Sequence, residues 1–219
     1  MHHSFRLCSL LALFLLAPSL RAALVSYDFG TTGSPTANAS SVDAHLTASA
    51  FSALSGGSLL TTDGNPGASF LGNRDWNKLP GDLTGNFFTF TLTAGLGYQI
   101  NLASISASVK ASASGPVSYQ WYSSVDNFAS AIASGTVTTS WTTPAAVDLS
   151  GAAYQGLSTV SFRLYGFDAP NNGVNSDFLV DNITVDGITA VPEPTTVALG
   201  VFAVLFAAVT TLRRRAAGR

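Results

Sequence analysis

Alternating apolar and polar positions recur along the middle of the chain. The segment NFFTFTLT (86–93) places Phe88, Phe90 and Leu92 on one face of an extended strand and Phe87 with three threonines on the other. A period of two residues is typical of a strand with one buried face. Because the second face is wetter than the first, we expect antiparallel sheets, which often bury one face and leave the other in water.

Two further segments, VSYQWY (117–122) and VSFRLY (160–165), share this alternation and resemble each other. Their apolar faces carry Val117, Tyr119, Trp121, Val160, Phe162 and Leu164. Their wetter faces carry Ser118, Gln120, Tyr122, Ser161, Arg163 and Tyr165. Each segment leaves through a tyrosine towards an aspartate, and we interpret the likeness as two strands of similar role rather than as a true repeat.

Turn-forming dipeptides rich in Gly, Pro, Asn and Asp separate the apolar runs. The predicted strands are 23–29, 45–53, 86–93, 97–109, 116–123, 131–138, 158–166 and 178–186. We expect an all-β fold, an antiparallel β-sandwich with a jelly-roll-like arrangement, in which residues 54–86 form an excursion over one end. An immunoglobulin-like sandwich is less favoured because its Cys–Trp–Cys core is absent.

The longest predicted strand changes phase part of the way along. Ile100 and Leu102 share one phase, whereas Ile105 has the opposite one. A regular strand cannot bury both sets on one side, because its side chains alternate strictly. We therefore predict a β-bulge or a change of sheet near Ala103 or Ser104.

The N-terminus departs from this pattern. His2, His3 and Arg6 precede an apolar run at 7–17, and small residues follow at 22 and 23. This order predicts a signal peptide over 1–22 and an exported ectodomain over 23–190. The alternative is a buried N-terminal helix; the run is short for a membrane span. The single cysteine, Cys8, lies in this segment, so removing it leaves a mature chain without disulfide or thiolate chemistry.

The C-terminus, residues 191–219, carries a second apolar run. Residues 196–212 hold no charge, and as a helix they would extend about 26 Å, close to the roughly 30 Å of a membrane core. Arginines follow at once, which predicts one transmembrane helix with its C-terminal end in the cytoplasm and the body outside. The alternatives are a plain anchor and a buried helix of the sandwich; the run is apolar all round rather than amphipathic.

Three features of this tail occur in a fixed order. Pro-Glu-Pro comes first, then the span, then the arginine cluster, which together comprise Pro192, Glu193, Pro194, Arg213, Arg214 and Arg215. In this order they resemble the PEP-CTERM sorting signal of Gram-negative bacteria. The resemblance covers about the last 29 residues. It implies exosortase as a partner, anchoring in the inner membrane before the tail is removed near the motif, and then a place on the cell surface or in the extracellular matrix.

The body also resembles the β-sandwich domains that precede such signals. The similar segments are VSYDF (25–29), FRLYGFDA (162–169) and LVDNITVDG (179–187). This resemblance is looser and implies no catalytic residues.

Charge in the body is strongly acidic. Residues 23–190 contain four Lys and Arg and eleven Asp but no Glu, a formal net charge of −7. A nucleic-acid partner is disfavoured, because phosphate backbones call for clustered Lys and Arg. Asp without Glu also suits turns, because an Asp side chain accepts hydrogen bonds from nearby backbone amides.

A structural Ca²⁺ site is one hypothesis for these acids. Asp181 shares its predicted strand phase with Leu179, Ile183 and Val185, and a carboxylate on an apolar face needs a partner. An acid near the first strand, Asp28, is the matching candidate, with Asp177 or a loop carbonyl as a further oxygen ligand, similar to the calcium sites of carbohydrate-binding jelly rolls. The alternatives are an Asp181 bonded to backbone amides or a different phase.

Glycan binding is a second hypothesis and requires an exposed aromatic platform. Trp76, in the turn-rich GNRDWNK, is the first candidate, and Trp141 lies in a similar context. Trp121 alternates with apolar residues and is assigned to the core. The alternative for Trp76 is an aromatic side chain that plugs one end of the sandwich.

Catalysis has little support. His45 is the only histidine of the body, and no G-x-S-x-G motif is present. We therefore predict a non-enzymatic protein of the cell surface or exopolysaccharide matrix that binds extracellular polysaccharide. The alternatives are a protein-binding adhesin or scaffold, and an Asp-dependent carbohydrate-active enzyme.

Overall fold

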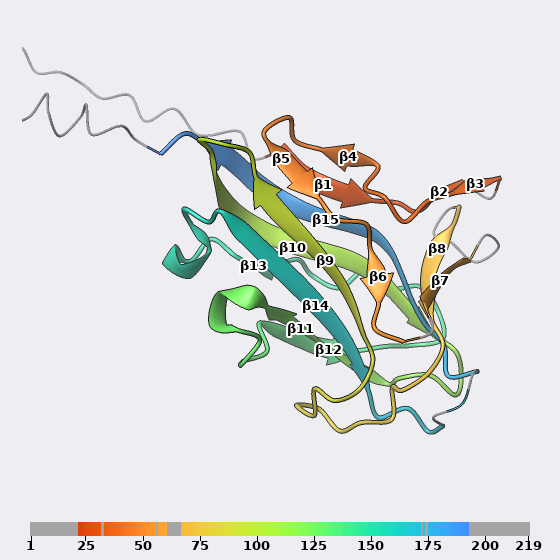
Figure 1. Ribbon diagram of the computed structural model, residues 1–219. Helices are drawn as coiled ribbons and strands as arrows, with labels where there is room; N and C mark the ends of the chain where they lie inside the picture. The colour runs from red at the N-terminus through yellow and green to blue at the C-terminus, as the bar shows by residue number, and fades with distance from the viewer. Residues whose placement is uncertain are drawn as a thin grey trace, which may run out of the picture.

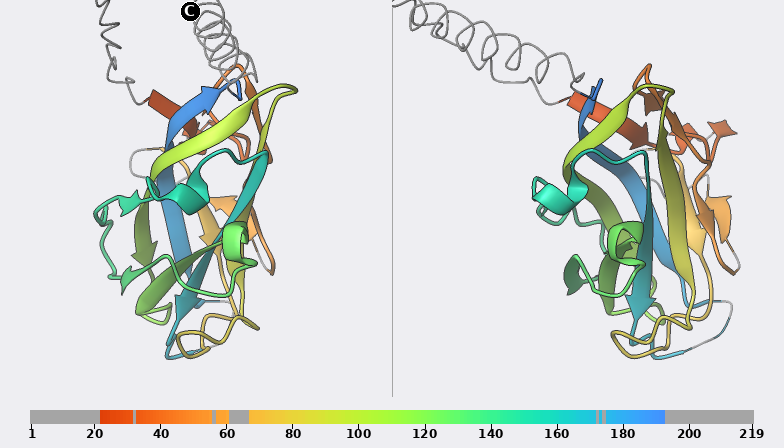
Figure 2. Two further views of the ribbon diagram at one scale, coloured as in Figure 1. Left: turned by 90° about the vertical axis from the view of Figure 1, so that its left-hand side faces the viewer. Right: turned by 60° about the vertical axis from the view of Figure 1, so that its left-hand side comes forward.

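The computed structural model describes residues 22–192, apart from 32, 56, 61–66, 172 and 174. These residues form two antiparallel sheets packed face to face (Figures 1 and 2). The predicted all-β antiparallel sandwich is therefore confirmed. Within this part of the chain no helix is long and apolar enough to cross a membrane. The predicted signal peptide and nearly all of the predicted sorting signal lie outside the described residues; Pro192 is described, and it is exposed.

The first sheet, sheet I, has seven strands. Its main order is β13-β10-β15-β1-β4, and β8 with β7 joins it along another part of β15. Its strands are β1 (Ala22–Tyr27), β4 (Ser41–Val42), β7 (Gly57–Leu60), β8 (Ser69–Gly72), β10 (Gln99–Ala111), β13 (Val147–Asp148) and β15 (Phe178–Ala190). The first and last strands lie side by side, so the two ends of the sandwich sequence meet in one sheet.

The second sheet, sheet II, has six strands in the order β12-β11-β14-β9-β5, with β6 also paired to β9. Its strands are β5 (Leu46–Ala48), β6 (Ser52–Ala53), β9 (Phe87–Ala94), β11 (Ser118–Ser123), β12 (Ala133–Thr136) and β14 (Thr159–Phe167). A separate pair, β2 (Gly30–Thr31) and β3 (Ser34–Pro35), and two 3₁₀ helices, η1 (Ser124–Asp126) and η2 (Ala152–Tyr154), complete the described elements.

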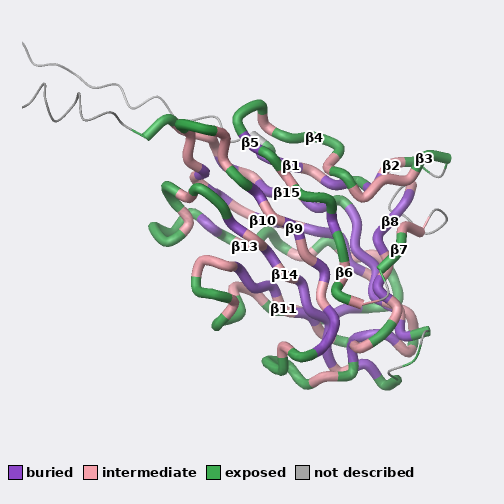
Figure 3. Tube along the Cα trace, viewed as in Figure 1, coloured by how far each residue is buried: buried purple, intermediate pink, exposed green. Residues whose placement is uncertain are grey.

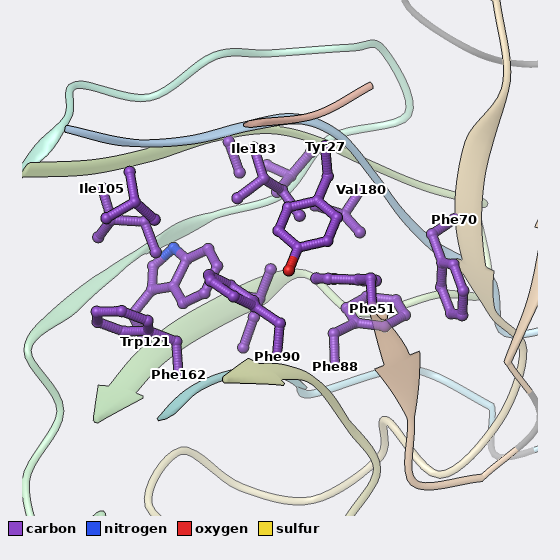
Figure 4. Packing of buried hydrophobic residues seen from close by; sticks show 14 of the residues in the cluster. Tyr27, Phe51, Phe70, Phe88, Phe90, Ile105, Trp121, Phe162, Val180 and Ile183 are labelled. Carbon is purple, nitrogen blue, oxygen red and sulfur yellow. The ribbon is translucent and has the colours of Figure 1, made fainter. Parts of the chain in front are cut away.

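The core between the sheets is rich in aromatic rings. Phe90 of sheet II packs against Tyr27 of sheet I with ring centroids 5.2 Å apart, and Phe51 and Phe70 meet edge to face at 5.0 Å (Figure 4). Such tilted contacts suit the ring quadrupoles. Figure 3 shows buried stretches along the central strands and exposed residues in the loops. Burial of this apolar surface is the main driving force for folding a domain without disulfides.

Two bulges interrupt the long strands of sheet I. The pairing of β10 with β15 shifts between Leu102 and Ser104, which confirms the predicted bulge at Ala103 without a change of sheet. A second shift leaves one extra residue on β15, where Asn182 adopts a left-handed φ of 49°. A bulge of this kind reverses the phase of the strand beyond it.

Seven of the eight predicted strands occur with shifted ends, and one is split. Residues 45–53 form β5 and β6 on either side of a break at 49–51, where the Ser49 hydroxyl accepts a hydrogen bond from the Thr91 amide. The prediction for 54–86 was wrong in part, because β7 and β8 of this segment extend sheet I. These strands have four residues each, GSLL and SFLG, and lack the alternation that identifies the other strands.

Candidate functional site

Trp76 is a core residue and not a surface platform, so the prediction of a glycan-binding Trp76 is wrong. Its side chain is fully buried and packs on Phe88 and Phe178 at centroid distances of 5.3 and 5.4 Å. Its Nε1 donates a hydrogen bond to the Gly72 carbonyl at 3.1 Å. Gly72 permits this contact, because a Cβ there would collide with the indole ring. The alternative interpretation, an aromatic plug at one end of the sandwich, is therefore correct.

The three predicted cation ligands lie in different surroundings. Asp28 is exposed, follows β1, and lines a hollow of about 420 Å³ together with Asn182. Asp181 is fully buried, but the bulge at Asn182 places it in phase with Leu179 and out of phase with the core residue Ile183, so the predicted phase was wrong. Asp177 lines another hollow, on the outer side of sheet I.

No group of three or more His, Cys, Asp or Glu side chains among the described residues could hold a metal ion. The three aspartates therefore do not form one ligand set, and Ca²⁺ binding stays a prediction that their placement does not support. Several aspartates instead accept hydrogen bonds from backbone amides two residues ahead, as expected for turns. These are Asp28, Asp43, Asp82 and Asp148.

The other candidate residues are two tryptophans and the histidine of the body. Trp121 is buried in the core as predicted, and Trp141 is half-buried. The exposed ring of His45 stacks on Tyr98 with centroids 3.9 Å apart and an interplanar angle of 8°. Neither Trp141 nor His45 belongs to a cluster of groups that suggests catalysis.

Aromatic side chains also gather on the outer face of sheet II, away from the main core. We call this group the outer cluster; its members are Leu83, Phe87, Tyr122, Phe128, Tyr165 and Phe167. Four of them, Phe87, Tyr122, Tyr165 and Phe167, come from β9, β11 and β14, from positions that alternate with core residues, so the sheet itself directs them outwards.

Arg163 lies against two rings of the outer cluster. Its guanidinium carbon is 3.8 Å from the ring centroid of Phe128 and 4.5 Å from that of Phe87. Both distances are within the range of cation–π attraction. The planar guanidinium therefore packs on two aromatic rings, and it carries five N–H donors.

Two tyrosines line the same face. The Tyr122 and Tyr165 rings meet edge to face at 5.4 Å, and the Tyr122 hydroxyl donates a hydrogen bond to Gln120 Oε1 at 2.7 Å. The Tyr165 hydroxyl is buried and has no hydrogen-bond partner in the structure. Burial raises the pKa of Tyr165, and the nearby positive charge of Arg163 opposes this effect. The Arg163 guanidinium does not donate a hydrogen bond of acceptable geometry to the Tyr165 hydroxyl.

The pairing of β9 with β14 extends this face into a row. Going along the two strands, the outward cross-strand pairs are Phe87–Tyr165, Thr89–Arg163, Thr91–Ser161 and Thr93–Thr159. We call these four pairs the outer strip; it is aromatic at one end and rich in hydroxyl groups at the other. The hydroxyls of Thr91 and Ser161 are 2.7 Å apart, and those of Thr93 and Thr159 are 3.3 Å apart. Three steps of two residues make the strip about 20 Å long.

The loop that holds Phe128 over Arg163 has an uncommon backbone. Asn127 and Phe128 both adopt left-handed φ angles, 59° and 61°. Asn tolerates this region, whereas a bulky residue such as Phe does so at a cost. Residues kept in such conformations often belong to functional sites.

The sequence patterns did not predict the outer strip as a site, although they placed every residue of the strip except Thr159 on a wetter strand face. A signal was present: aromatic residues and an arginine recur at outward positions of three predicted strands. The two similar segments also each placed a tyrosine outward, and those tyrosines, Tyr122 and Tyr165, are in contact. Only the strand order shows that these positions are neighbours.

The hollows of the surface fit a ligand less well. The one beside Asp177, about 380 Å³, has leucine walls, namely Leu60, Leu71 and Leu179. The one beside Asp28 lacks aromatic side chains, and a third, lined by Asn101 and Gln155, has only about 160 Å³. None of them combines a ring surface with several hydroxyl groups.

No family model matches this chain, and no curated protein matches it. Solved structures similar to it include a family 11 carbohydrate-binding module of a cellulosomal cellulase of Clostridium thermocellum (15% identity, TM-score 0.38, covering 78% of this chain and 97% of the module). A variant of a family 29 module complexed with mannohexaose has 12% identity and a TM-score of 0.39, with coverage of 76% and 92%. A cleaved adhesin domain of Lys-gingipain from Porphyromonas gingivalis W83 has 14% identity and a TM-score of 0.37, and the match covers 76% of this chain and 96% of that domain. These TM-scores are below 0.5, so the function is argued from the residues of this chain alone.

Proposed function

We propose that this chain is an exported, non-enzymatic surface protein whose jelly-roll-like sandwich binds extracellular polysaccharide along the outer strip. The observation that carries the proposal is the register of β9 and β14. It aligns an arginine that packs on two aromatic rings with a row of hydroxyl groups. Sugar rings have apolar faces that pack on aromatic side chains, and hydroxyl rims that need donors and acceptors. The Tyr165 ring of the strip is buried, so the half-buried ring of Phe87 and the row of hydroxyl groups are the surfaces that a sugar would contact, within about 20 Å.

The C-terminal segment is proposed to be the sorting signal that its motifs resemble. It would hold the body at the inner membrane until exosortase removes it. The placement of the two ends supports this topology, because Ala22 pairs with Gly187 on β15 and the same strand continues to Ala190. A signal peptide and an anchor that leave one end of a sandwich can enter the same membrane.

Affinity electrophoresis tests glycan binding. The full chain in detergent is run through native gels that contain soluble β-glucan, mannan, xylan or alginate. We expect at least one polysaccharide to retard the chain, and Arg163→Ala to weaken that retardation by about tenfold, the effect of losing about 1.4 kcal/mol. Arg74→Ala, which removes an exposed arginine from outside the outer cluster, is the matched control and should behave like the parent chain.

The outcomes separate the candidate functions. Equal retardation of the parent and Arg163→Ala would move the binding site away from the outer strip. No retardation in any gel would contradict glycan binding and favour the protein-binding adhesin.

A further inference from the structure

One end of the sandwich combines the ends of the described chain with exposed apolar side chains. Gln99, at the start of β10, pairs with Ala190 at the end of β15, and the β9–β10 turn comes directly before Gln99. Figure 1 shows this turn beside the end of β15. Leu96 in the turn is fully exposed, at 103% of its reference area, and Val191 after β15 is 60% exposed.

The turn presents Leu96 in a defined position. The Tyr98 amide donates a hydrogen bond to the Gly95 carbonyl at 3.0 Å, which closes a four-residue turn with Leu96 at its second position. Gly97 at the third position has a φ of 81°, as a type II turn requires. Leu96 is therefore one of the two central residues of a tight turn that connects the two sheets.

Neighbouring contacts hold this turn against sheet II. The Gly95 amide donates to the His45 carbonyl at 2.7 Å, and the His45 ring stacks on Tyr98 at 3.9 Å. A leucine on a supported turn loses little conformational freedom when it enters another phase, which makes insertion less costly than for a leucine on a loose loop.

The sequence that follows brings a membrane close to this end. Only four residue steps separate Pro192 from Thr196, where the uncharged run of 17 residues begins. Fully extended, those steps span at most about 14 Å. When the apolar run is inserted, Pro192 therefore lies within about 14 Å of the membrane, and the end of β15, two residues earlier, lies within about 21 Å. The neighbouring β9–β10 turn lies at a similar height.

We propose that the β9–β10 turn is a membrane-contacting surface, and that Leu96 inserts into the boundary between lipid headgroups and acyl chains while the tail is anchored. This inference rests on the proposed anchoring by the C-terminal segment. The contact orients the sandwich on the membrane, with the hydroxyl end of the outer strip nearest to the lipid and the aromatic end furthest from it. Apolar side chains at this boundary gain from burial in the same way as the face of an interfacial helix.

A single-cysteine label tests the contact. The chain has one cysteine, Cys8, so Cys8→Ser combined with Leu96→Cys leaves one site for an environment-sensitive fluorophore. Leu79→Cys is the matched control: Leu79 is 72% exposed and lies in the loop before β9, whereas Leu96 follows the end of that strand. Eight residues of β9, about 27 Å, separate the two ends.

Both labelled full-length chains are reconstituted into vesicles of phosphatidylcholine and phosphatidylglycerol, and vesicle flotation measures anchoring separately. We expect the label at Leu96 to shift to shorter emission wavelengths and to be quenched by brominated lipids at least threefold more than the label at Leu79. A chain that floats with the vesicles but shows equal, water-like emission at both positions overturns the membrane contact and leaves the anchor intact. A chain that fails to float contradicts the anchor itself, and with it this inference.

Discussion

The main core and the outer cluster are both rich in aromatic residues, but they differ in whether their buried polar atoms have hydrogen-bond partners. In the core, the Trp76 indole donates to the Gly72 carbonyl and the Tyr27 hydroxyl donates to the Ser49 carbonyl at 2.7 Å. In the outer cluster the Tyr165 hydroxyl is buried without a partner. None of the unpartnered buried side-chain atoms in the described residues belongs to the main core. Such an atom costs stability, so the outer cluster differs from the core in containing one buried hydroxyl that its own packing leaves without a partner.

The largest expected effect is in the core. Trp76→Ala should destabilise the fold by about 3–5 kcal/mol, because it removes a fully buried indole from between Phe88 and Phe178. Urea denaturation followed by tryptophan fluorescence or circular dichroism measures the change. A loss below about 1 kcal/mol would mean that the end of the sandwich closes without Trp76, and would break the distinction between the two regions.

A pair of hydroxyl deletions compares the regions directly. Tyr27→Phe should cost about 1–1.5 kcal/mol, since it removes a partner from the Ser49 carbonyl. Tyr165→Phe removes a hydroxyl that has no partner and should change stability by less than about 0.5 kcal/mol. The two variants lose the same atom, so urea midpoints compare them without a correction for volume. Equal losses would show that the Tyr165 hydroxyl is bonded in solution.

A smaller effect on stability is expected at Phe128. Phe128→Gly relieves a left-handed backbone but removes one ring from Arg163, and these opposing effects should leave the stability within about 1 kcal/mol. Retardation by the bound polysaccharide should nevertheless fall, because the Arg163 guanidinium loses one of the two aromatic rings on which it packs. Asn127→Gly is the control, because Asn127 also has a left-handed φ, of 59°, but carries no aromatic ring. This variant should retain binding. Parallel losses in both variants would assign the effect to the loop rather than to the ring.

The smallest expected effect concerns Asp177, a polar group outside both regions. Burial raises the pKa of the Asp177 carboxyl, so the folded chain holds its proton more tightly than the unfolded chain does. This contribution is therefore complete below the ordinary Asp pKa and is lost as the pH rises through the raised value. Thermal midpoints between pH 3 and 7 should show Asp177→Asn gaining relative to the parent chain as the pH rises.

Asp82 provides a control of opposite sign. Hydrogen bonds from the hydroxyl and amide of Thr84 lower the pKa of Asp82, so its contribution is present above the ordinary value and is lost as the pH falls through the lowered one. Asp82→Asn should therefore lose relative to the parent as the pH rises. The same trend in both variants would contradict the assigned causes.

Local alternation was sufficient for the strands that carry most of the fold. The strands β9, β11 and β14 alternate core and outward residues, and the parity change between Leu102 and Ile105 correctly predicted a bulge. The same parity change between Val180 and Ile183 was not used, and the phase assigned to Asp181 was wrong for that reason. The strands β7 and β8 have only four residues each, with two adjacent apolar residues instead of an alternation, so their pairing with each other and with β15 had no local signal.

Trp76 shows the limit of local context. Its neighbours are polar and turn-forming, which predicted exposure, yet the open end between the sheets accommodates the indole. For the outer strip, local context predicted each strand correctly, but the strip itself forms only through the pairing of β9 with β14.

The sequence by itself determined the strand faces, the antiparallel sandwich and the acidic turn-rich surface, because a side-chain period of two is encoded by neighbouring residues. It also carries the motifs at both ends of the chain that predict export and sorting. Only the tertiary structure decided which outward residues are neighbours, that Trp76 closes the core, and that Leu96 lies beside the start of the tail. These are consequences of strand order and register, which depend on contacts between residues far apart in the chain and therefore have no signature in any one segment.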